Sequence, residues 1–462
     1  MKVKIGLETH VQILSNSKLF CGCATQGDEK PNTRVCPTCL GFPGSKPRVN
    51  EKVINHALKV ALAFNCKINK ETFFSRKTYF YPDMAKNFQI SQYEIPLAEK
   101  GFLMLGNKKI RIKRIHIEED PAKLVHIGGL GGKYVLVDYN RSGIPLIEIV
   151  TEPDFENPRQ AREFVHKLET ILEYLGVYDP LICTMRSDAN ISLEDGERVE
   201  VKNITGTKDI EKALNYEIVR QKNLILRGGS VERETRAWNS DLSVTQRLRG
   251  KEFEEDYGYI FEPDLTKIEF SRELIQKIKK ELPELPEQKY LRFIKEYGIS
   301  QKLSESLVSE LDIANLFEEI ARKINPKLAA SWIAGPLKKT LNWNNLRWKN
   351  SGLKKEWILN LLKIFERGEI TDRNTELTIR KMVEEKKPPE EIIKKYSFAK
   401  TKIKDLDETI DKILERNKQA VKDYKTGQKK ALDFLIGQII KETQGRIDPK
   451  EIREILKKKL AI

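Results

Sequence analysis

Hydrophobic and polar positions follow two different patterns along the chain. Up to about residue 265, short alternating apolar runs are separated by Gly, Pro and Asn, which is typical of antiparallel strands. Beyond the turn-rich segment 261–264, apolar residues recur at helical spacing among many Lys and Glu. We therefore predict an α+β fold with an antiparallel-sheet domain over 1–265, a helical domain over 266–393 and a small helical tail domain over 394–462.

One helix stands out within the strand-rich half. Asn157 suits an N-cap, Pro158 suits the first helical position, and Gly176 suits the end. The apolar residues between them form a single stripe, which predicts a helix that packs on the core.

Polar residues share one face of several predicted strands. In the first strand the apolar residues have odd numbers, whereas Glu8 and His10 lie on the other face. His116 and Glu118 would project together in the same way, and Glu148 interrupts an apolar run, where an unpaired charge is costly. Such a set suits a hard ion such as Mg²⁺ bridged to phosphates. A solvated strand face explains the Glu8 and His10 pair at least as well.

The segment 76–87 mixes cations, aromatic rings and amides. Lys77 or Lys86 could offset phosphate charge, and Tyr79 or Tyr81 could stack on a base, which suits a nucleotide or the end of an acylated tRNA. An ordinary aromatic strand explains the segment equally well.

Net charge narrows the choice of partner. Lys and Arg number 83 against 68 Asp and Glu, and this excess of 15 favours a polyanion such as nucleic acid. Residues 394–462 hold 19 Lys and Arg against 11 Asp and Glu, over half of the excess, which suggests contact with RNA. A Lys-rich proteome and a solvated helical surface are the alternatives. Because the sequence has neither an apolar signal core nor a membrane-spanning run, we expect a cytoplasmic protein without membrane contact.

Four of the six cysteines are clustered. Cys21 and Cys23 form one close pair, and Cys36 and Cys39 form a second after twelve intervening residues. Such thiolate pairs predict a closed tetrahedral zinc site with a structural role, and a redox dithiol is the alternative. The other two cysteines lack a partner in sequence and are predicted to be buried fillers.

Several catalytic signatures are absent. The segment 128–134 resembles a phosphate loop, but Ile127 and Tyr134 stand where that motif needs Gly and Ser or Thr, so we predict a hairpin turn. Residues 126–129 likewise lack the second His of class I tRNA synthetases. The sequence also lacks an amidase signature and a glutaminase cysteine, so any ammonia must come from another chain.

Nine segments together resemble one family, the B subunits of the tRNA-dependent amidotransferases. They are GLETH at 6–10, RKTYFYPD at 76–83, QISQ at 89–92, HIEED at 116–120, DYNRSGIPLIE at 138–148, RSDANIS at 186–192, EVKN at 200–203, LPELP at 282–286 and GQIIK at 437–441. They occur in order and cover essentially the whole chain, so the resemblance is specific.

The resemblance implies a cradle-shaped catalytic domain, a helical domain and a small tail domain that contacts tRNA. The family's cradle uses ATP and Mg²⁺ to phosphorylate the side-chain carboxylate of Glu on tRNA(Gln) or Asp on tRNA(Asn). Ammonia from glutamine hydrolysis in a partner amidase, the A subunit, then displaces phosphate. A small C subunit is the third member of the heterotrimer. This implies a ligase that forms carbon–nitrogen bonds in protein biosynthesis.

Carried over by position, the family's site falls on residues flagged above. The resemblance implies Glu8, His10, Lys77, Glu118, Glu119 and Glu148 as catalytic residues, with Mg²⁺ on Glu8, His10, Glu118 and Glu148. It implies ATP-site contacts from Tyr79, Tyr81, Lys86, Asn140, Arg141, Lys202 and Asn203. Some members lack the four cysteines, which supports structural zinc here.

The chain departs from the family pattern in two places. Gly258 stands where Arg is usual, and Thr205 and Gly206 stand where Asn and Ser are usual. The runner-up interpretation is a zinc-stabilised RNA-binding protein without catalysis, against which the clustered carboxylates argue because they would repel phosphate. A glutamine-hydrolysing enzyme acting alone ranks last, because it needs a nucleophile that the sequence does not offer.

Overall fold

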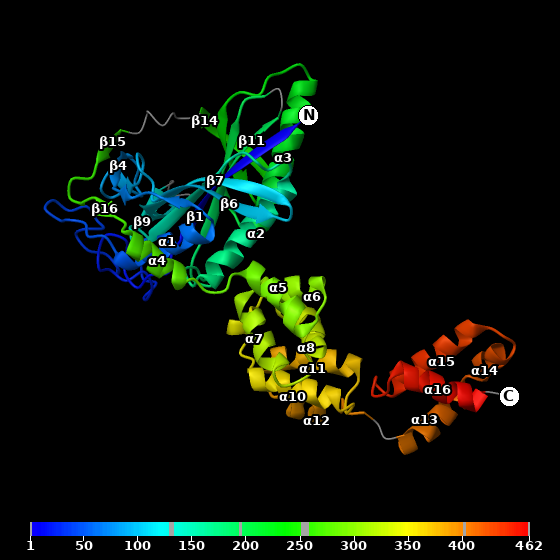
Figure 1. Ribbon diagram of the computed structural model, residues 1–462. Helices are drawn as coiled ribbons and strands as arrows, with labels where there is room; N and C mark the ends of the chain where they lie inside the picture. Colours follow the sequence, from blue (N-terminus) through cyan, green and yellow to red (C-terminus); the bar gives the residue numbers. More distant parts are fainter. Residues whose placement is uncertain (1, 129–133, 194–195, 251–257, 401–402, 461–462) are drawn as a thin grey trace. The chain divides into compact units, whose positions relative to one another are not determined.

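The computed structural model describes residues 2–128, 134–193, 196–250, 258–400 and 403–460 (Figure 1). The chain divides into two compact units, Met1–Leu285 and Pro286–Ile462. All of the described strands lie in the first unit, and the described part of the second is helical. The α+β class is therefore confirmed, while the three-domain division near residues 266 and 394 stays a prediction.

A nine-stranded sheet organises the first unit. Its order is β14-β13-β12-β11-β1-β10-β7-β6-β2, and neighbours run antiparallel except β12 and β13, which are parallel. The strands are β1 (Val3–Gln12), β2 (Lys67–Ile68), β6 (Ala98–Leu105), β7 (Lys108–Glu119), β10 (Pro145–Thr151), β11 (Met185–Leu193), β12 (Val199–Thr205), β13 (Glu234–Asn239) and β14 (Val244–Gly250). The central strands thus come from distant parts of the sequence.

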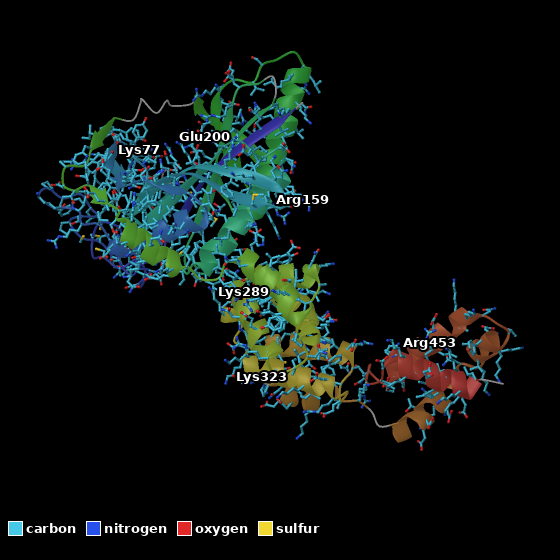
Figure 2. All side chains as sticks on the ribbon, in the orientation of Figure 1. Lys77, Arg159, Glu200, Lys289, Lys323 and Arg453 are labelled. Atoms are coloured by element: carbon cyan, nitrogen blue, oxygen red, sulfur yellow. The ribbon has the colours of Figure 1, made fainter. Side chains whose placement is uncertain are left out.

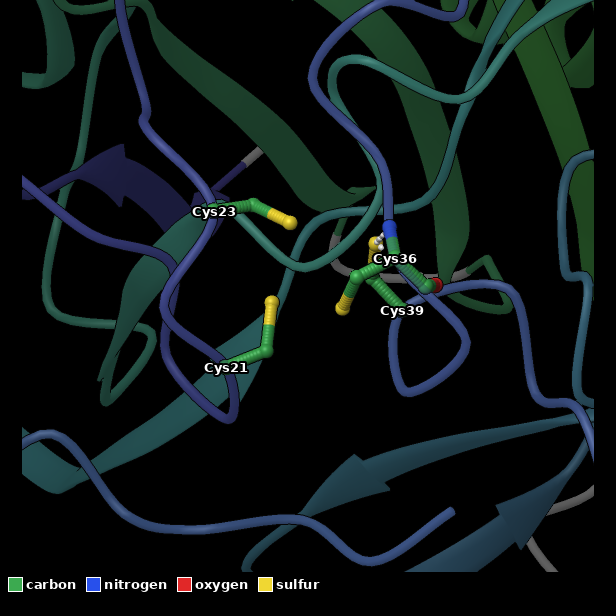
Figure 3. Close-up of side chains that lie close together, drawn as sticks. All are labelled: Cys21, Cys23, Cys36 and Cys39. Carbon is green, nitrogen blue, oxygen red and sulfur yellow. Dashed lines mark hydrogen bonds between the residues drawn. The ribbon is translucent and has the colours of Figure 1, made fainter.

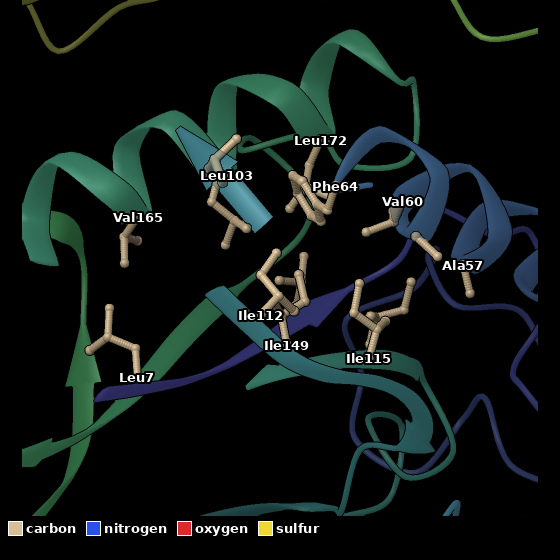
Figure 4. Close-up of a cluster of buried hydrophobic side chains, with 14 of the residues drawn as sticks. Leu7, Ala57, Val60, Phe64, Leu103, Ile112, Ile115, Ile149, Val165 and Leu172 are labelled. Carbon is tan, nitrogen blue, oxygen red and sulfur yellow. The ribbon is translucent and has the colours of Figure 1, made fainter. Parts of the chain in front are cut away.

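Helices cover the apolar face of this sheet. Figure 4 shows side chains of α1 (Glu51–Ala63) and α2 (Pro158–Tyr174) above odd-numbered strand residues such as Leu7 and Ile149. The helix α3 (Thr207–Leu226) contacts β11 and β12. Because side chains alternate along a strand, the even-numbered residues of β1 face away from these helices.

The predicted helix after Asn157 is confirmed. Asn157 accepts a hydrogen bond from the backbone N–H of Gln160 at 3.0 Å, and Pro158 opens α2. Gly176 follows the helix with a φ of 66°, a left-handed conformation that glycine adopts without strain. The residues of the predicted stripe, such as Phe164 and Leu168, are fully buried.

Smaller sheets complete the first unit. A three-stranded sheet has the order β15-β4-β5, while β16 pairs with β3 and β8 pairs with β9. These strands are β3 (Glu71–Thr72), β4 (Ser75–Thr78), β5 (Phe88–Ser91), β8 (Lys123–Ile127), β9 (Tyr134–Asp138), β15 (Tyr259–Phe261) and β16 (Ile268–Glu269). The predicted hairpin turn at 128–134 falls largely on residues outside the described ones, but its flanks pair antiparallel with Ile127 opposite Tyr134.

The helix α1 carries a buried histidine that predicts a pH effect on stability. Burial, aided by the charges of Lys52 and Lys59, lowers the pKa of His56 to about 4. Below its ordinary pKa of 6.5, the unfolded chain therefore binds a proton that the folded chain excludes. We expect the lowered pKa of His56 to reduce the free energy of unfolding by about 2 kcal/mol at pH 5 relative to pH 7.5. Urea unfolding of the wild type and of His56→Gln at both pH values tests this, and equal losses would contradict it.

The remaining helices begin with α4 (Arg272–Lys280) in the first unit. The second unit contains α5 (Pro286–Tyr297), α6 (Gln301–Val308), α7 (Leu311–Ala321), α8 (Pro326–Trp332), the π-helix η2 (Ile333–Leu337), α9 (Lys338–Trp343), the 3₁₀ helix η3 (Trp348–Asn350), α10 (Lys355–Glu366), α11 (Asp372–Glu385), α12 (Pro389–Lys395), α13 (Ile403–Arg416), α14 (Lys418–Lys425), α15 (Lys429–Glu442) and α16 (Pro449–Leu460). Apolar residues of α13, α15 and α16, including Ile410, Leu435 and Leu456, form a separate core. In the part of the chain that the structure describes, every helix is too short or too polar to cross a bilayer.

Candidate active site and metal centre

Two histidines and two glutamates meet on the sheet face away from the helices. His10 of β1 lies opposite Glu148 of β10, which lies opposite His116 of β7. His10 Nδ1 is 3.1 Å from Glu118 Oε1 and 3.9 Å from Glu148 Oε2. His116 Nε2 is 3.0 Å from Glu148 Oε2 and 3.7 Å from Glu118 Oε2. Polar positions of three neighbouring strands thus form one cluster.

The carboxylates hold both histidines in the charged form. Burial lowers the pKa of His10, but the hydrogen bond to Glu118 and the charge of Glu148 raise it to about 10. Burial also lowers the pKa of His116, which the charge of Glu148 and hydrogen bonds to both glutamates raise to about 9. Burial raises the pKa of Glu148, but the charge of His116 outweighs it and sets the pKa at about 2. Burial likewise opposes ionisation of Glu118, but hydrogen bonds from the two imidazoles hold its pKa well below the usual range.

Three of these residues could hold a metal ion. His10, Glu118 and Glu148 each offer one ligand atom, and the three atoms lie within 4.8 Å of one another. The donors are one imidazole nitrogen and two carboxylate oxygens, and oxygen-rich sets suit hard cations such as Mg²⁺.

A cavity of about 670 Å³ opens over this cluster and contains charges of both signs. Lys77 and Glu200, both labelled in Figure 2, come from β4 and β12 and line it together. Its charged lining residues are Lys4, Glu8, Lys77, Lys113, Arg114, His116, Glu118, Glu148, Glu152, Arg198, Glu200, Lys202 and Arg233. Carboxylates next to cations suit a ligand that carries phosphate groups together with a metal ion.

Glu8 lies in the same cavity but is held in a different electrostatic state. Its Oε1 accepts a hydrogen bond from Asn190 Nδ2 at 2.9 Å. Burial, followed by the charges of Glu148, Glu200 and Asp188, raises the pKa of Glu8 above its usual value. Glu8 is therefore distinct from the three residues that could share one ion, although the sequence placed it among the Mg²⁺ ligands.

Glu119 and Lys86 lie away from the cavity. Because successive residues of a strand point to opposite faces, Glu118 and Glu119 cannot both face the cluster. The carboxylate of Glu119 accepts a hydrogen bond from the Lys86 ammonium and another, at 2.9 Å, from the backbone N–H of Ile90. The structure brings these two predicted site residues together as a buried ion pair.

Of the other residues predicted to contact the nucleotide, some lie at the cavity and some do not. Lys202 lines the cavity with Lys77, and the backbone N–H of Asn203 donates to Asp188 at 3.2 Å. Tyr79 and Tyr81 are not among the residues that line the cavity. Their rings lie next to each other, with centroids 6.0 Å apart.

Asn140 and Arg141 lie outside the cavity as well. Asn140 is buried and accepts a hydrogen bond from the backbone N–H of Arg34. Arg141 donates to the carbonyl oxygens of Pro121 and Ala122. Both side chains thus tie loops together in the described structure.

Several residues that contribute to this site were not among those carried over from the family. His116 contacts Glu148, yet only its parity with Glu118 signalled it. On β11, Asp188 lies opposite Glu8 and Asn190 lies opposite Gly6. In the sequence, only the alternation of these two polar residues with the apolar Ala189 and Ile191, which are buried, indicates that they share the polar face. Which strand lies beside β1 depends on the fold, so local spacing could not join these residues to Glu8.

The four clustered cysteines form a second potential metal centre. Figure 3 shows Cys21 and Cys23 facing Cys36 and Cys39 from a separate loop segment. Their Sγ atoms all lie within 4.8 Å of one another, so four thiolates fit a tetrahedral site. The backbone N–H of Cys36 also donates to Cys39 Sγ at 3.2 Å. The loop geometry therefore supports the predicted metal site.

A buried lysine lies beside these thiols. Lys18 is fully buried, and its ammonium is 3.6 Å from Cys39 Sγ and 3.2 Å from the Tyr139 carbonyl oxygen. A hydrogen bond with Cys21 lowers the pKa of Cys39 to about 5, aided by the Cys36 backbone and the charge of Lys18. The Lys18 ammonium thus provides a fixed positive charge next to a group of potential anions.

Known proteins match both units of the chain. Residues 3–276 match the family described as the GatB/GatE catalytic domain, and residues 315–460 match the GatB domain. A relative from Sulfolobus acidocaldarius is 47% identical over 472 residues, with 100% of each chain covered. One from Thermotoga maritima is 43% identical, with 99% of this chain and 98% of the relative covered. Both relatives are named as the B subunit of an aspartyl/glutamyl-tRNA(Asn/Gln) amidotransferase. The chain therefore belongs to the GatB/GatE family, among the B subunits of the tRNA-dependent amidotransferases.

Proposed function

We propose that this protein activates misacylated Glu-tRNA(Gln), Asp-tRNA(Asn) or both, using ATP and Mg²⁺, and then amidates them. The observation that carries the proposal is the convergence of His10, Glu118 and Glu148, two of which, Glu118 and Glu148, line a cavity that Lys77 also lines. An oxygen-rich ion site beside a cation suits phosphoryl transfer, where the protein mainly positions groups and offsets charge.

The reaction needs activation because a carboxylate resists nucleophilic attack. In the proposed first step, an oxygen of the Glu or Asp side chain attacks the γ-phosphorus of ATP, and ADP leaves. In the second step, ammonia attacks the resulting acyl phosphate and phosphate departs, taking up the proton that nitrogen releases. The products are Gln-tRNA(Gln) or Asn-tRNA(Asn).

The chain's own residues have separate roles in this proposal. Bound Mg²⁺ would neutralise phosphate charge and orient the transferred group. His10, Glu118 and Glu148 would hold the ion, His10 through a deprotonated imidazole nitrogen and the two glutamates through carboxylate oxygens. Lys77 offsets charge on the transferred phosphoryl group. Glu8 lies next to Asn190 within the same cavity and positions the substrate.

The cysteine centre has a structural role in the proposal. A four-sulfur zinc site leaves no position for water or substrate, so zinc would hold the two loop segments together. Asn32, between the cysteine pairs, accepts a hydrogen bond from the backbone N–H of Tyr139 at 2.7 Å, and its own backbone N–H donates to Asp138. Zinc bound here would therefore also fix the 138–143 loop.

Lys18 should contribute to zinc affinity. Replacing it with Met removes the positive charge 3.6 Å from Cys39 Sγ, and we expect zinc binding to weaken about tenfold. Competition against a chromophoric chelator measures the change. Lys46→Met is the matched control, since Lys46 is exposed and pairs with Asp264. Equal zinc affinity in the two variants would contradict the role of Lys18.

The proposed complex includes two other proteins. We infer an amidase partner, the A subunit, that releases ammonia from glutamine, because the sequence lacks a glutaminase nucleophile. Misacylated tRNA together with a small C subunit would complete the cytoplasmic assembly. The basic tail would contact the body of the tRNA.

The cysteine cluster and the basic tail also favour a second candidate, a zinc-stabilised RNA-binding protein without catalysis. Release of labelled phosphate from ATP separates the two. The assembled complex should consume ATP only with Mg²⁺ and with Glu-tRNA(Gln) or Asp-tRNA(Asn). If neither tRNA stimulates phosphate release although tRNA still binds, the non-catalytic RNA-binding protein is the better interpretation.

A further inference from the structure

Four cations extend along the cavity from the metal-binding end. Lys4, Lys113, Arg114 and Arg198 all line it, and none of them appears in an ion pair or side-chain hydrogen bond among the described residues. Arg114 Nε is buried and lacks a hydrogen-bond partner there. A buried guanidinium nitrogen without a partner is unfavourable, so an anionic ligand would satisfy it.

A β-bulge turns two of these cations toward the cavity. Val150 pairs with Arg114, but the next residue, Thr151, pairs with Ile112, so Lys113 is an extra residue on β7. In a regular strand, Lys113 and Arg114 would point to opposite faces, whereas both line the cavity. Bulges near active sites commonly redirect a side chain in this way.

The strand register places the cations at increasing distances from the His10 cluster. Arg114 shares a row with Val150 and Glu8, two residues along from the row of His10, or about 7 Å. Lys4 lies six residues from His10 on the same strand, or about 20 Å. The three adjacent phosphates of one nucleotide could not span this length, whereas phosphates repeated along a single strand could.

Aromatic rings line the same cavity. Tyr93, just after β5, and Tyr259 of β15 stack with ring centroids 3.9 Å apart and planes 12° from parallel. Grooves that bind single-stranded nucleic acid combine a series of cations with aromatic surfaces for bases. Five carboxylates also line the cavity, so the lining is not uniformly basic: Glu8, Glu118, Glu148, Glu152 and Glu200.

We propose that Lys113, Arg114, Lys4 and Arg198 bind phosphates of the single-stranded 3′ end of the tRNA and guide its acyl group to the His10 cluster. This inference rests on the proposed function, since it assumes that the acylated end is the substrate. The four cations are positioning residues, because they would contact the RNA backbone away from the reacting atoms.

Variants of the assembled enzyme test the proposal. Lys113→Gln and Arg114→Gln should each weaken binding of misacylated tRNA about tenfold, the loss expected for one charge-assisted hydrogen bond. The KM for ATP should stay unchanged. The slope of log affinity against log salt should fall by about 0.7 for each phosphate contact removed. Lys67→Gln is the matched control, because Lys67 is exposed on β2 and does not line the cavity.

A tRNA without its single-stranded 3′ end isolates the contact. Wild type and variants should bind this shortened tRNA equally. A loss of affinity that persists with it, or a raised KM for ATP with normal tRNA binding, would overturn the inference. Because tRNA binding is measured without turnover, it also decides the inference if the wild-type complex fails to consume ATP, an outcome that would refute the proposed function alone.

Discussion

Replacing Glu118 with Gln should reduce ATP consumption by the assembled complex roughly a thousandfold. The substitution keeps the shape of the side chain but removes a charge that faces His10 at 3.1 Å and His116 at 3.7 Å. It also removes one of the three ligand atoms that could hold the proposed Mg²⁺. Release of labelled phosphate with misacylated tRNA measures the loss.

Binding of tRNA by Glu118→Gln should stay near the wild-type level, since Glu118 belongs neither to the basic tail nor to the four cavity cations proposed to bind the tRNA 3′ end. Glu163→Gln is the control, because Glu163 is exposed on α2 and pairs with Arg159. Unchanged ATP turnover in Glu118→Gln would refute the assignment of the ion site. A parallel loss of tRNA binding would instead point to a damaged fold.

Removing the tail should produce the opposite pattern. Ending the chain after Lys400 keeps Tyr396 and Phe398, which hydrogen-bond to Glu385 and Asn374. It removes the separate core of α13, α15 and α16 together with most of the tail's excess positive charge. We expect tRNA affinity to fall about a hundredfold at low salt, because counterion release depends on the number of phosphate contacts.

The truncated chain should retain the folded first unit and its capacity to bind zinc. A milder variant, Lys457→Gln with Lys458→Gln, keeps the tail folded because both side chains are exposed on α16. It should weaken tRNA binding less than truncation and lower the salt dependence. Filter binding at several salt concentrations measures both effects. Retained affinity in the truncated chain would refute the role of the tail.

The alternation of apolar and polar side chains along a single strand could be predicted from the sequence. The odd-numbered apolar residues of β1 predicted that Glu8 and His10 share the polar face, and both lie on it. The helix at Pro158 was equally readable, because capping signals and a helical stripe are local. The cysteine spacing predicted the group that the structure brings together.

Features that depend on which strands pair could not be predicted from the sequence. The bulge at Lys113 exists only relative to β10, more than thirty residues away in the sequence. The resemblance implied both Glu118 and Glu119 as catalytic residues. Strand alternation, however, puts them on opposite faces, and Glu119 pairs with Lys86 on the face away from the His10 cluster. Asn140 looked like a ligand contact, but its amide joins two loops.

The two faces of β1 constrain how this domain can change in length. Inserting one residue directly before Glu8, with the preceding residues held in register, would turn Glu8 and His10 into the apolar layer beneath α2 and expose the buried Val11. Such a change would bury charges without partners and empty the catalytic face at the same time. We therefore expect this strand to tolerate insertions and deletions only in pairs or with a compensating bulge, whereas the surface loops between strands should lengthen more easily.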